Sequence, residues 1–418
     1  MDFRVCENPL GLTRFAIFFA HENVKEAEIS SNTHISTSAE TAIFIEMLDE
    51  FHQLAYFQHS LKRASSMKEF EKSSREALCD LLRKVPIIDI KSLEATPQTK
   101  YWAPDFIVEI ATSGKSRSLV CEVKASGQPR FVNAAILQLR DYISAWDIDV
   151  TAIVIAPYLS PAARQACREK GVGYLDLEGN AWISFDGVFI DHQVADKPPA
   201  EHRELKSLFK PKSAQILRAM LREPAHAWRV IELSEAASAS LGQVSNVRTA
   251  LLDREWGQVT SNGFFLCDPQ ALLDAWVEAY EPPSGERKKF YTTLHGSALE
   301  NAARSVIGEQ SCGRTLFSSF SAAQWLAPYA RVGTHYFYAD SDGLDTLIEA
   351  LQLVPASKGE NVVITVPRDE GLLLDTVEAA PGVLCTSPVQ TYLDLTAAGE
   401  RAKEAAEYLR QEKLTWPR

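Results

Sequence analysis

The stretch SLVCEVKASG, residues 118–127, has the apolar residues of a buried strand, interrupted by two charged side chains, Glu122 and Lys124. They lie two residues apart, so in a β-strand both point to the same face. The preceding stretch PDFIVEI places Asp105 and Glu109 on one face of a second strand. The short connection TSGKSRS predicts an antiparallel hairpin, which would bring the carboxylates and the lysine together.

Such a cluster suggests metal-dependent chemistry on a phosphodiester. Two carboxylates held close together repel each other unless a cation joins them, and oxygen ligands at this spacing suit Mg²⁺. We therefore predict a metal site formed by carboxylates of this cluster, which holds Asp105, Glu109 and Glu122. Lys124 would orient or deprotonate a water, while the metal would stabilise the charge developing on the phosphate. The alternative is an ordinary charge pair on a half-exposed strand.

These residues lie in a block of alternating helices and strands. The apolar strand TAIVIAP suits the centre of a mixed sheet that helices cover on both faces. The order αβββαβ, followed by further strands, predicts an α/β layer fold. The expected helices are at about residues 67–84, 131–146 and 160–170, and the expected strands near 87–91, 105–111, 118–125, 151–157, 173–176, 180–185 and 188–192.

The dipeptide PD that ends at Asp105, followed by EVK from Glu122 to Lys124, resembles the PD-(D/E)XK motif of restriction-endonuclease-like nucleases. The αβββαβ order is the core of that family, and the resemblance covers roughly residues 67–192. It implies that Asp105 and Glu122 hold the metal and that Lys124 is the catalytic lysine.

A second motif lies on the next helix. Gln138 and Tyr142, in QLRDY, resemble the QxxxY element of RecB-type nucleases, which implies that they too belong to the catalytic site. An acidic residue on the first helix would complete the pattern, with Glu71 or Glu76 as candidates. Because this scaffold is also kept for binding after catalysis is lost, DNA cleavage is a separate question from the fold.

The middle of the chain is locally basic. Residues 203–262 hold nine Lys and Arg against six Asp and Glu, a net of +3 in a chain of net charge −12. Three short helices are expected, in KSAQILRAMLRE, RVIELSEAA and LGQVSNVRTALLDREW, and a capping box of Ser240 and Gln243 begins the third. A hairpin between Gly257 and Gly263 follows. This pattern predicts a winged helix-turn-helix.

The third helix of this block has two faces. Val244, Val247 and Leu251 recur at helical spacing and must face the core. Asn and Gln can pair with adenine edges and Arg with guanine or phosphate, so the opposite face suits a DNA groove. Lys210 and Lys212 would contact the DNA backbone, as would 260–262 at the tip of the hairpin. The outward residues predicted to bind DNA are Gln243, Ser245, Asn246, Arg248 and Thr249.

The last block mixes strands at 332–339 and 360–367 with helices and ends in a long helical pattern at 387–411. Together with the winged helix, its SPVQ, YLDL and GERAKEAA segments resemble the AbiEi-like antitoxins of type IV toxin–antitoxin systems, over about residues 203–418. That family consists of transcriptional regulators that bind operator DNA and oppose a nucleotidyltransferase toxin. This chain departs from the family by placing a nuclease-like block first.

Two polar stretches, 193–212 and 281–289, contain Pro or Gly and are predicted to be linkers. They divide an α/β multidomain protein into three parts. We expect a nuclease-like domain with an N-terminal elaboration, a winged helix-turn-helix and an antitoxin-like α/β domain, at residues 1–195, 203–280 and 290–418.

The composition limits the cellular location and the kinds of site that we expect. The seven cysteines of this 418-residue chain are scattered and form no CxxC pair, so neither a disulfide framework nor a zinc site is expected. The longest apolar run near the N-terminus, FAIFFA, is too short to cross a bilayer. We expect a cytoplasmic protein without a membrane segment.

Three hypotheses follow for the function. The first is a DNA-binding transcriptional regulator or antitoxin-like protein, a homodimer on double-stranded DNA, with a nucleotidyltransferase toxin as a candidate partner. The second is a Mg²⁺-dependent endodeoxyribonuclease that the winged helix targets. The third is a protein adaptor without nucleic acid, which should lack the salt-sensitive binding that phosphate contacts produce.

Overall fold

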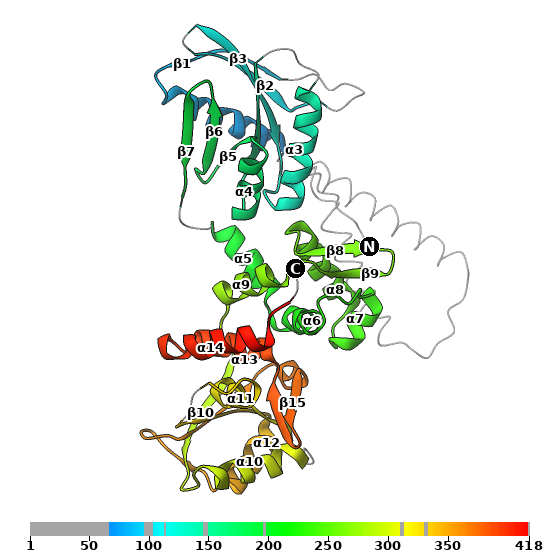
Figure 1. Ribbon diagram of the computed structural model, residues 1–418, viewed down its shortest axis with the longest axis vertical. Coiled ribbons are helices and arrows are strands. Elements are labelled where there is room, and N and C mark those ends of the chain that lie inside the picture. Colours follow the sequence, from blue (N-terminus) through cyan, green and yellow to red (C-terminus); the bar gives the residue numbers. More distant parts are fainter. Residues whose placement is uncertain are drawn as a thin grey trace, which may run out of the picture. The chain divides into compact units, whose positions relative to one another are not determined.

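The structure is a computed structural model that describes residues 67–95, 103–112, 114–144, 149–194, 198–309, 313–329 and 333–416. The chain divides into two compact units, residues 1–70 and 71–418, and almost all described residues belong to the second. The elaboration expected at the N-terminus lies outside the described residues. What is described is a mixed α/β protein (Figure 1), as the sequence predicts.

The first sheet has seven strands in sequential order, β1 to β7, with β3, β4 and β5 parallel and the other neighbours antiparallel. A helix over residues 67–83 precedes it. The predicted order of elements is confirmed here. The bounds are β1 Ile88–Ala95, β2 Phe106–Thr112, β3 Lys115–Val123, α3 Pro129–Ile143, β4 Val150–Ala156, α4 Pro161–Glu169, β5 Gly173–Asp176, β6 Ala181–Phe185 and β7 Val188–His192.

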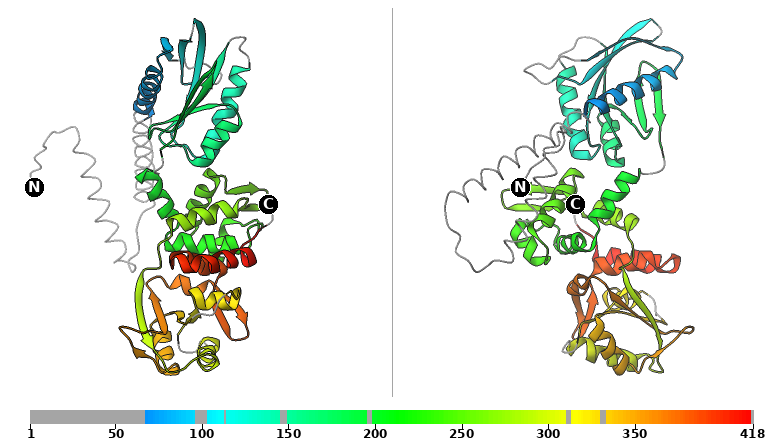
Figure 2. Two further views of the ribbon diagram at one scale, coloured as in Figure 1. Left: turned by 60° about the vertical axis from the view of Figure 1, so that its left-hand side comes forward. Right: turned by 180° about the vertical axis from the view of Figure 1, so that it is seen from behind.

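Helices cover both faces of this sheet (Figure 2), which explains the continuous apolar run of β4. Val132, Ile136 and Leu139 of α3 share a core with Val154 of β4 on one face. Figure 2 shows the helix over residues 67–83, in blue, on the other face. The sheet therefore holds its central strands, and the charges at their ends, in a fixed frame.

A helical block with one hairpin follows. The predicted linker at 193–212 is wrong, because α5 occupies half of it and buries Leu205 and Leu208. Phe209, which follows α5, stacks on Trp276 with ring centroids 5.2 Å apart. The bounds are α5 Pro199–Leu208, α6 Pro211–Arg222, α7 Val230–Ala236, α8 Leu241–Asp253, β8 Gly257–Thr260, β9 Gly263–Leu266 and α9 Pro269–Ala279.

A second seven-stranded sheet has the order β13-β10-β14-β12-β11-β16-β15. The linker predicted at 281–289 is also wrong, since β10 begins at Gly285 and pairs with β14. The bounds are β10 Gly285–Tyr291, α10 Ser297–Glu309, β11 Thr315–Phe317, α11 Ser319–Leu326, β12 His335–Ala339, α12 Ser341–Ala350, β13 Val354–Pro355, β14 Val362–Pro367, η1 Glu370–Leu374, β15 Thr376–Ala380, β16 Val383–Thr386, α13 Pro388–Ala397 and α14 Glu400–Lys413.

The long helix predicted at 387–411 is two helices. Gly399 lies between α13 and α14 with φ of 96°, in the left-handed region that glycine adopts at least strain. Ser387 begins α13 by accepting a hydrogen bond from the Gln390 amide at 3.3 Å. The chain therefore turns at Gly399, and α14 packs beside α13.

One continuous hydrophobic core joins the helical block to the second sheet. It includes Leu217 of α6, Val247 of α8, Trp276 of α9, Ile364 of β14 and Leu393 of α13. The three predicted domains, 1–195, 203–280 and 290–418, stay a prediction, but the last two share this core. No helix among the described residues is long and apolar enough to cross a membrane.

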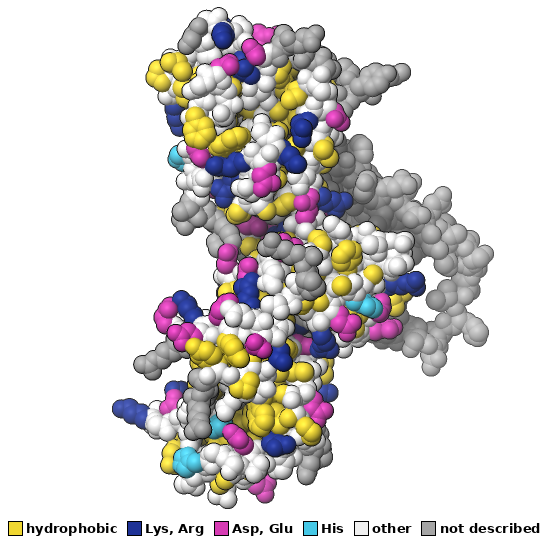
Figure 3. Space-filling view, in the orientation of Figure 1, with side chains coloured by type: hydrophobic (Ala, Val, Ile, Leu, Met, Phe, Trp, Pro, Cys, Tyr) yellow, Lys and Arg dark blue, Asp and Glu magenta, His cyan; other side chains and the backbone are white. Residues whose placement is uncertain are grey.

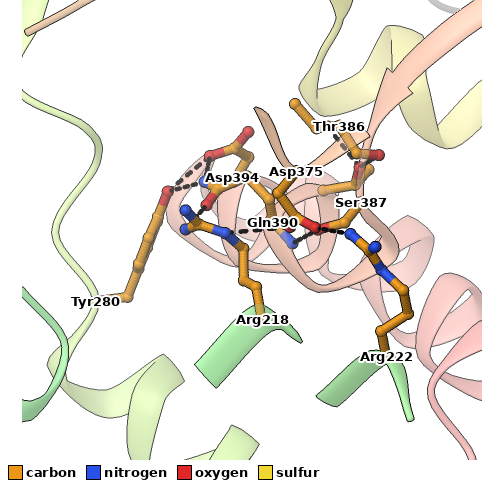
Figure 4. Close-up of polar contacts among 9 residues, drawn as sticks. Arg218, Arg222, Tyr280, Asp375, Thr386, Ser387, Gln390 and Asp394 are labelled. Atoms are coloured by element: carbon orange, nitrogen blue, oxygen red, sulfur yellow. Dashed lines mark hydrogen bonds and ion pairs between the residues drawn. The ribbon is translucent and has the colours of Figure 1, made fainter. Parts of the chain in front are cut away.

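A buried polar network crosses the same junction (Figure 4). The Arg218 side chain is only 4% exposed and pairs with Asp375 at 3.1 Å. It also donates to Gln390 Oε1 at 3.1 Å. Arg222, one turn further along α6, pairs with the same carboxylate. Because an unpaired buried charge is strongly unfavourable, these contacts fix α6 against the segment before β15 and against α13.

Asp394 of α13 ends the network. Its carboxylate accepts hydrogen bonds from the Tyr280 hydroxyl at 2.7 Å, the Tyr338 hydroxyl at 3.0 Å and the side-chain amide of Gln390 at 2.9 Å. Burial raises the pKa of Asp394 to about 6, although these hydrogen bonds and the Arg218 charge oppose the rise. The carboxyl therefore binds a proton more readily in the folded protein than in the unfolded chain.

We expect the Asp394→Asn variant to lose part of the pH dependence of stability. As pH rises from 3.8 to about 6, the unfolded chain releases this proton first, so the free energy of unfolding of the wild type falls relative to the variant. The difference changes by at most about 1.4 kcal/mol per pH unit. Urea unfolding of both proteins at several pH values measures it, and parallel curves would contradict the raised pKa.

Candidate functional site

The antiparallel pairing of β2 and β3 brings Asp105 beside Glu122. Phe106 faces Cys121 across the ladder, so Asp105, just before β2, lies opposite Glu122. The Asp105 carboxylate accepts a hydrogen bond from the Val123 amide at 2.6 Å. Its own amide donates to the Cys121 carbonyl at 3.1 Å. The carboxyl is therefore held by backbone at the end of two central strands.

Lys124 lies between an acid and an amide. Its ammonium donates to Glu122 Oε1 at 2.6 Å and to Gln138 Oε1 of α3 at 3.2 Å. The Lys124 amide extends the ladder to β4 by donating to the Ile155 carbonyl at 2.8 Å. Four of the predicted catalytic residues, Asp105, Glu122, Lys124 and Gln138, are thus gathered at one edge of the sheet.

Both carboxyls hold a proton more tightly than they would in water, mainly because they are buried. Burial raises the pKa of Glu122 to about 7, the Asp105 charge adds to the rise, and the hydrogen bond from Lys124 opposes it. Burial also raises the pKa of Asp105, against the Val123 hydrogen bond and the charges of Lys124 and Arg75. Two acids in this state favour either a shared proton or a bound cation.

The donor set fits a hard divalent cation. Glu122 Oε2 is buried and has no hydrogen-bond partner among the described residues, which leaves this oxygen available to a ligand. The described part of the chain contains no cluster of three or more His, Cys, Asp or Glu suited to a metal. Mg²⁺ commonly takes only one or two carboxylates and completes its shell with water and phosphate, so two suffice.

Some predicted participants do not join the cluster. Glu109 pairs with Ser118 across the ladder and is exposed, so the expected convergence of three carboxylates is wrong. Glu76 is 65% exposed and pairs with Lys72 at 3.9 Å on the helix surface. Tyr142 of α3 is half-buried and packs against the core, and its part in the catalytic site stays a prediction.

Arg75 is a neighbour of the site that the sequence did not suggest. Its guanidinium lies 3.5 Å from the Asp105 carbonyl and over the Phe106 ring, 5.2 Å from the ring centre. The first helix therefore contributes a cation beside the acids, with Glu71 half-buried one turn earlier. The nuclease pattern asks for an acidic residue on this helix, so it gave no reason to single out an arginine.

Helix α8 has the two faces that the sequence predicts. Val244, Val247 and Leu251 are buried, and Ser245, Asn246 and Thr249 are exposed. The buried stripe anchors the helix, so its outer side chains project to solvent beside the β8–β9 hairpin.

Two other predicted contacts on α8 have structural roles. The Gln243 side chain closes the capping box by accepting from the Ser240 amide at 2.9 Å. The Arg248 guanidinium lies over the Phe264 ring of β9, 5.8 Å from its centre. Both are half-buried, so the fully exposed polar surface of α8 is narrower than predicted.

The hairpin beside α8 is tied to the rest of the block through Trp228, which exchanges backbone hydrogen bonds with Phe264 at 2.8 and 2.9 Å. A Cβ at position 263 would lie 2.4 Å from the Trp228 carbonyl oxygen, so only glycine fits there. Residues 260–262 at the tip are exposed.

Lys210 and Lys212 lie at the start of α6, exposed to solvent. Lys212 approaches Asp369 to 4.0 Å, and Lys210 lines a cavity of about 220 Å³ together with Trp276 and Asp369. Lys212 thus lies near an acidic residue of the segment between β14 and η1. The contact of both lysines with DNA stays a prediction.

Comparison with known proteins supports one of the two resemblances. Residues 266–415 match the family described as transcriptional regulator, AbiEi antitoxin, Type IV TA system. The match begins at the end of β9 and includes α9, the second sheet, α13 and all of α14. The C-terminal part of the chain is therefore similar to the AbiEi antitoxins, and residues 203–265 lie outside the match.

The other comparisons add little. Among solved structures, the crystal structure of a repair endonuclease from Pyrococcus abyssi aligns at 16% identity with a TM-score of 0.18. The alignment covers 25% of this chain and 46% of that chain, and a likeness this weak carries no argument about the fold. No curated protein matches the chain.

We expect Asp105→Ala to destabilise the first sheet by about 1–3 kcal/mol, because the Val123 amide loses its acceptor at a buried position. Glu109→Ala, on the same strand but exposed, should change the free energy of unfolding by less than about 0.5 kcal/mol. Urea unfolding of the two variants and the wild type measures both effects. If both variants lose the same free energy of unfolding, the hydrogen bond from Val123 to Asp105 does not stabilise the sheet.

Proposed function

We propose that this chain is a DNA-binding transcriptional regulator of the antitoxin kind. The observation that carries the proposal is the surface of α8, where Ser245, Asn246 and Thr249 are exposed on a helix whose opposite side is buried. Three helices, α6, α7 and α8, followed by the β8–β9 hairpin, fit a winged helix-turn-helix with α8 as the recognition helix. Asn246 would read a base edge, and residues 260–262 would approach the backbone.

The AbiEi match supports a regulatory role over direct catalysis. Antitoxins of this kind oppose a toxin, so a nucleotidyltransferase toxin is the partner we propose for the C-terminal part. A homodimer would suit an operator with two half-sites. A regulator of this kind that also carries a sheet with acidic residues at the ends of two strands would differ from a simple antitoxin.

The charge distribution suggests modest reliance on phosphate contacts. On the face drawn in Figure 3, Lys and Arg side chains occur in small groups among acidic ones. The net charge of −12 opposes the approach of the chain to DNA, and the local excess in residues 203–262 is only +3. Specific contacts from α8 must therefore provide much of the affinity.

We expect Asn246→Ala to weaken binding to a duplex selected from a random library by about 1–3 kcal/mol, because one base contact is lost. Asn301→Ala, an exposed asparagine on α10, is the matched control and should bind as the wild type does. Fluorescence anisotropy at several salt concentrations measures both. If neither the wild type nor the variants bind any duplex, or if the two variants weaken binding equally, the proposed role of α8 is wrong.

A second candidate function is a Mg²⁺-dependent endodeoxyribonuclease. It is favoured by the cluster of Asp105, Glu122, Lys124 and Gln138, with the buried oxygen of Glu122 that lacks a partner among the described residues. Asp105 and Glu122 would hold the metal, which would supply positive charge to the phosphate. Lys124, fixed between Glu122 and Gln138, would orient the attacking water or protonate a leaving oxygen.

For this function we expect nicking of supercoiled DNA by the full chain with Mg²⁺ or Mn²⁺, and a loss of at least about 100-fold in Lys124→Ala. Lys115→Ala is the matched control, since Lys115 lies on the same strand but is exposed. Gel electrophoresis over time measures the rates. Intact DNA that is retarded in the gel would support the regulator, and equal nicking by both variants would exclude a catalytic Lys124.

A further inference from the structure

A small cavity lies where α6, the end of α7 and η1 meet. Its volume is about 120 Å³, and Gln215, Trp228, Ser238 and Asp375 are among the residues that line it. Arg222 also lines it and is exposed, so the cavity is open to solvent at that edge. The residues assigned above to DNA or to a metal line other surfaces. The cavity is therefore a separate feature of the molecule.

The cavity wall contains a buried amide that needs a partner. The Gln215 side chain is 6% exposed, and neither its oxygen nor its nitrogen has a hydrogen-bond partner among the described residues. Burying an amide in this state is unfavourable, because water would satisfy both groups in the unfolded chain. An occupant of the cavity that donates to Oε1 and accepts from Nε2 would remove this penalty.

Trp228 adds a second donor to the same wall. Its indole Nε1 is buried, and within the described ranges it too has no hydrogen-bond partner. The edge of the Trp228 ring is fixed by His226, whose ring centre lies 4.3 Å away. The Asp375 carboxylate adds a charged acceptor and is held in place by Arg218 and Arg222 (Figure 4). Besides the Arg222 guanidinium at the open edge, which is paired with Asp375, the wall thus offers two N–H donors and two kinds of acceptor.

The backbone opposite Gln215 leaves room for this amide. A Cβ at position 371 would come within 1.1 Å of Gln215 Nε2. Gly371 does not adopt the positive φ that would by itself require glycine. The absence of a side chain at this position is therefore explained by the space that the Gln215 amide takes.

The arrangement matches one functional group. A primary carboxamide has an oxygen that accepts two hydrogen bonds and an NH₂ that donates two. Its oxygen would accept from Gln215 and Trp228, and its NH₂ would donate to Gln215 and Asp375. A carboxylate would lack the donors and would face Asp375, and an ammonium would lack an acceptor. We propose that this cavity binds a small primary carboxamide through Gln215, Trp228 and Asp375.

Size limits the rest of the ligand. The cavity is smaller than the roughly 150 Å³ that admits benzene in an engineered protein core, although its open edge allows part of a ligand to protrude. The carboxamide group or a short chain therefore fits inside, and a small ring attached to it would protrude through the open edge. The inference does not depend on the proposed function, since it concerns a different surface and is tested by a different measurement.

The test uses the full chain with two probes, nicotinamide and propionamide, and follows binding by saturation-transfer NMR and calorimetry. We expect both to bind, and N,N-dimethylnicotinamide, which lacks the N–H donors, to bind at least about tenfold more weakly. If neither carboxamide binds, water alone fills the cavity and the proposal is wrong. Equal affinity for nicotinamide and its dimethyl derivative would also overturn it.

Variants assign the binding to the cavity. Gln215→Leu and Trp228→Phe should each weaken nicotinamide binding about tenfold, and Gln411→Leu, an exposed glutamine on α14, should not. The melting temperature of Gln215→Leu without ligand should equal or exceed that of the wild type, because a buried amide without partners is removed. If Gln215→Leu fails to fold, Trp228→Phe decides alone, and unchanged affinity in the folded variants overturns the proposal.

Discussion

The buried guanidinium of Arg218 is the contact on which the C-terminal half of the molecule depends. It pairs with Asp375 and hydrogen-bonds to Gln390, so one side chain of α6 joins the helical block to the segment before β15 and to α13. A charge this deeply buried is tolerated only while its partners stay in place. The position of α6, and through the shared core that of α8, is thereby coupled to the part of the chain that matches the antitoxin family.

The cost of burying a charged group also applies in the first sheet, where the buried groups are negative. There the buried groups are acids, and a single ammonium, that of Lys124, offsets two carboxyls. Because the balance is incomplete, Glu122 keeps a proton to about pH 7 unless a cation takes its place. In the C-terminal network each buried charge thus has a partner of opposite charge or several hydrogen-bond donors, whereas Glu122 between β2 and β3 keeps an oxygen without a hydrogen-bond partner among the described residues.

Much of the fold and of the candidate site could be predicted from the sequence, and the exceptions have physical causes. The alternation in β2 and β3 placed Asp105 beside Glu122, and the stripe of Val244, Val247 and Leu251 gave the orientation of α8. The polar, Pro-containing stretches 193–212 and 281–289 predict linkers. Instead α5 and β10 form there, because tertiary partners bury the few apolar residues of these stretches. Arg75 and Arg218 act through residues far away in sequence, which no local spacing encodes.

The shared core between the helical block and the second sheet limits how the chain can be divided. Trp276 and Leu272 of α9 are buried against both, so a cut after α9 would leave large apolar surfaces exposed on each fragment. A cut before α5 would separate far less buried surface of this core. Genetic exchange between proteins of this architecture would thus keep α5 to α14 together, and the first sheet is the portion that recombination can replace.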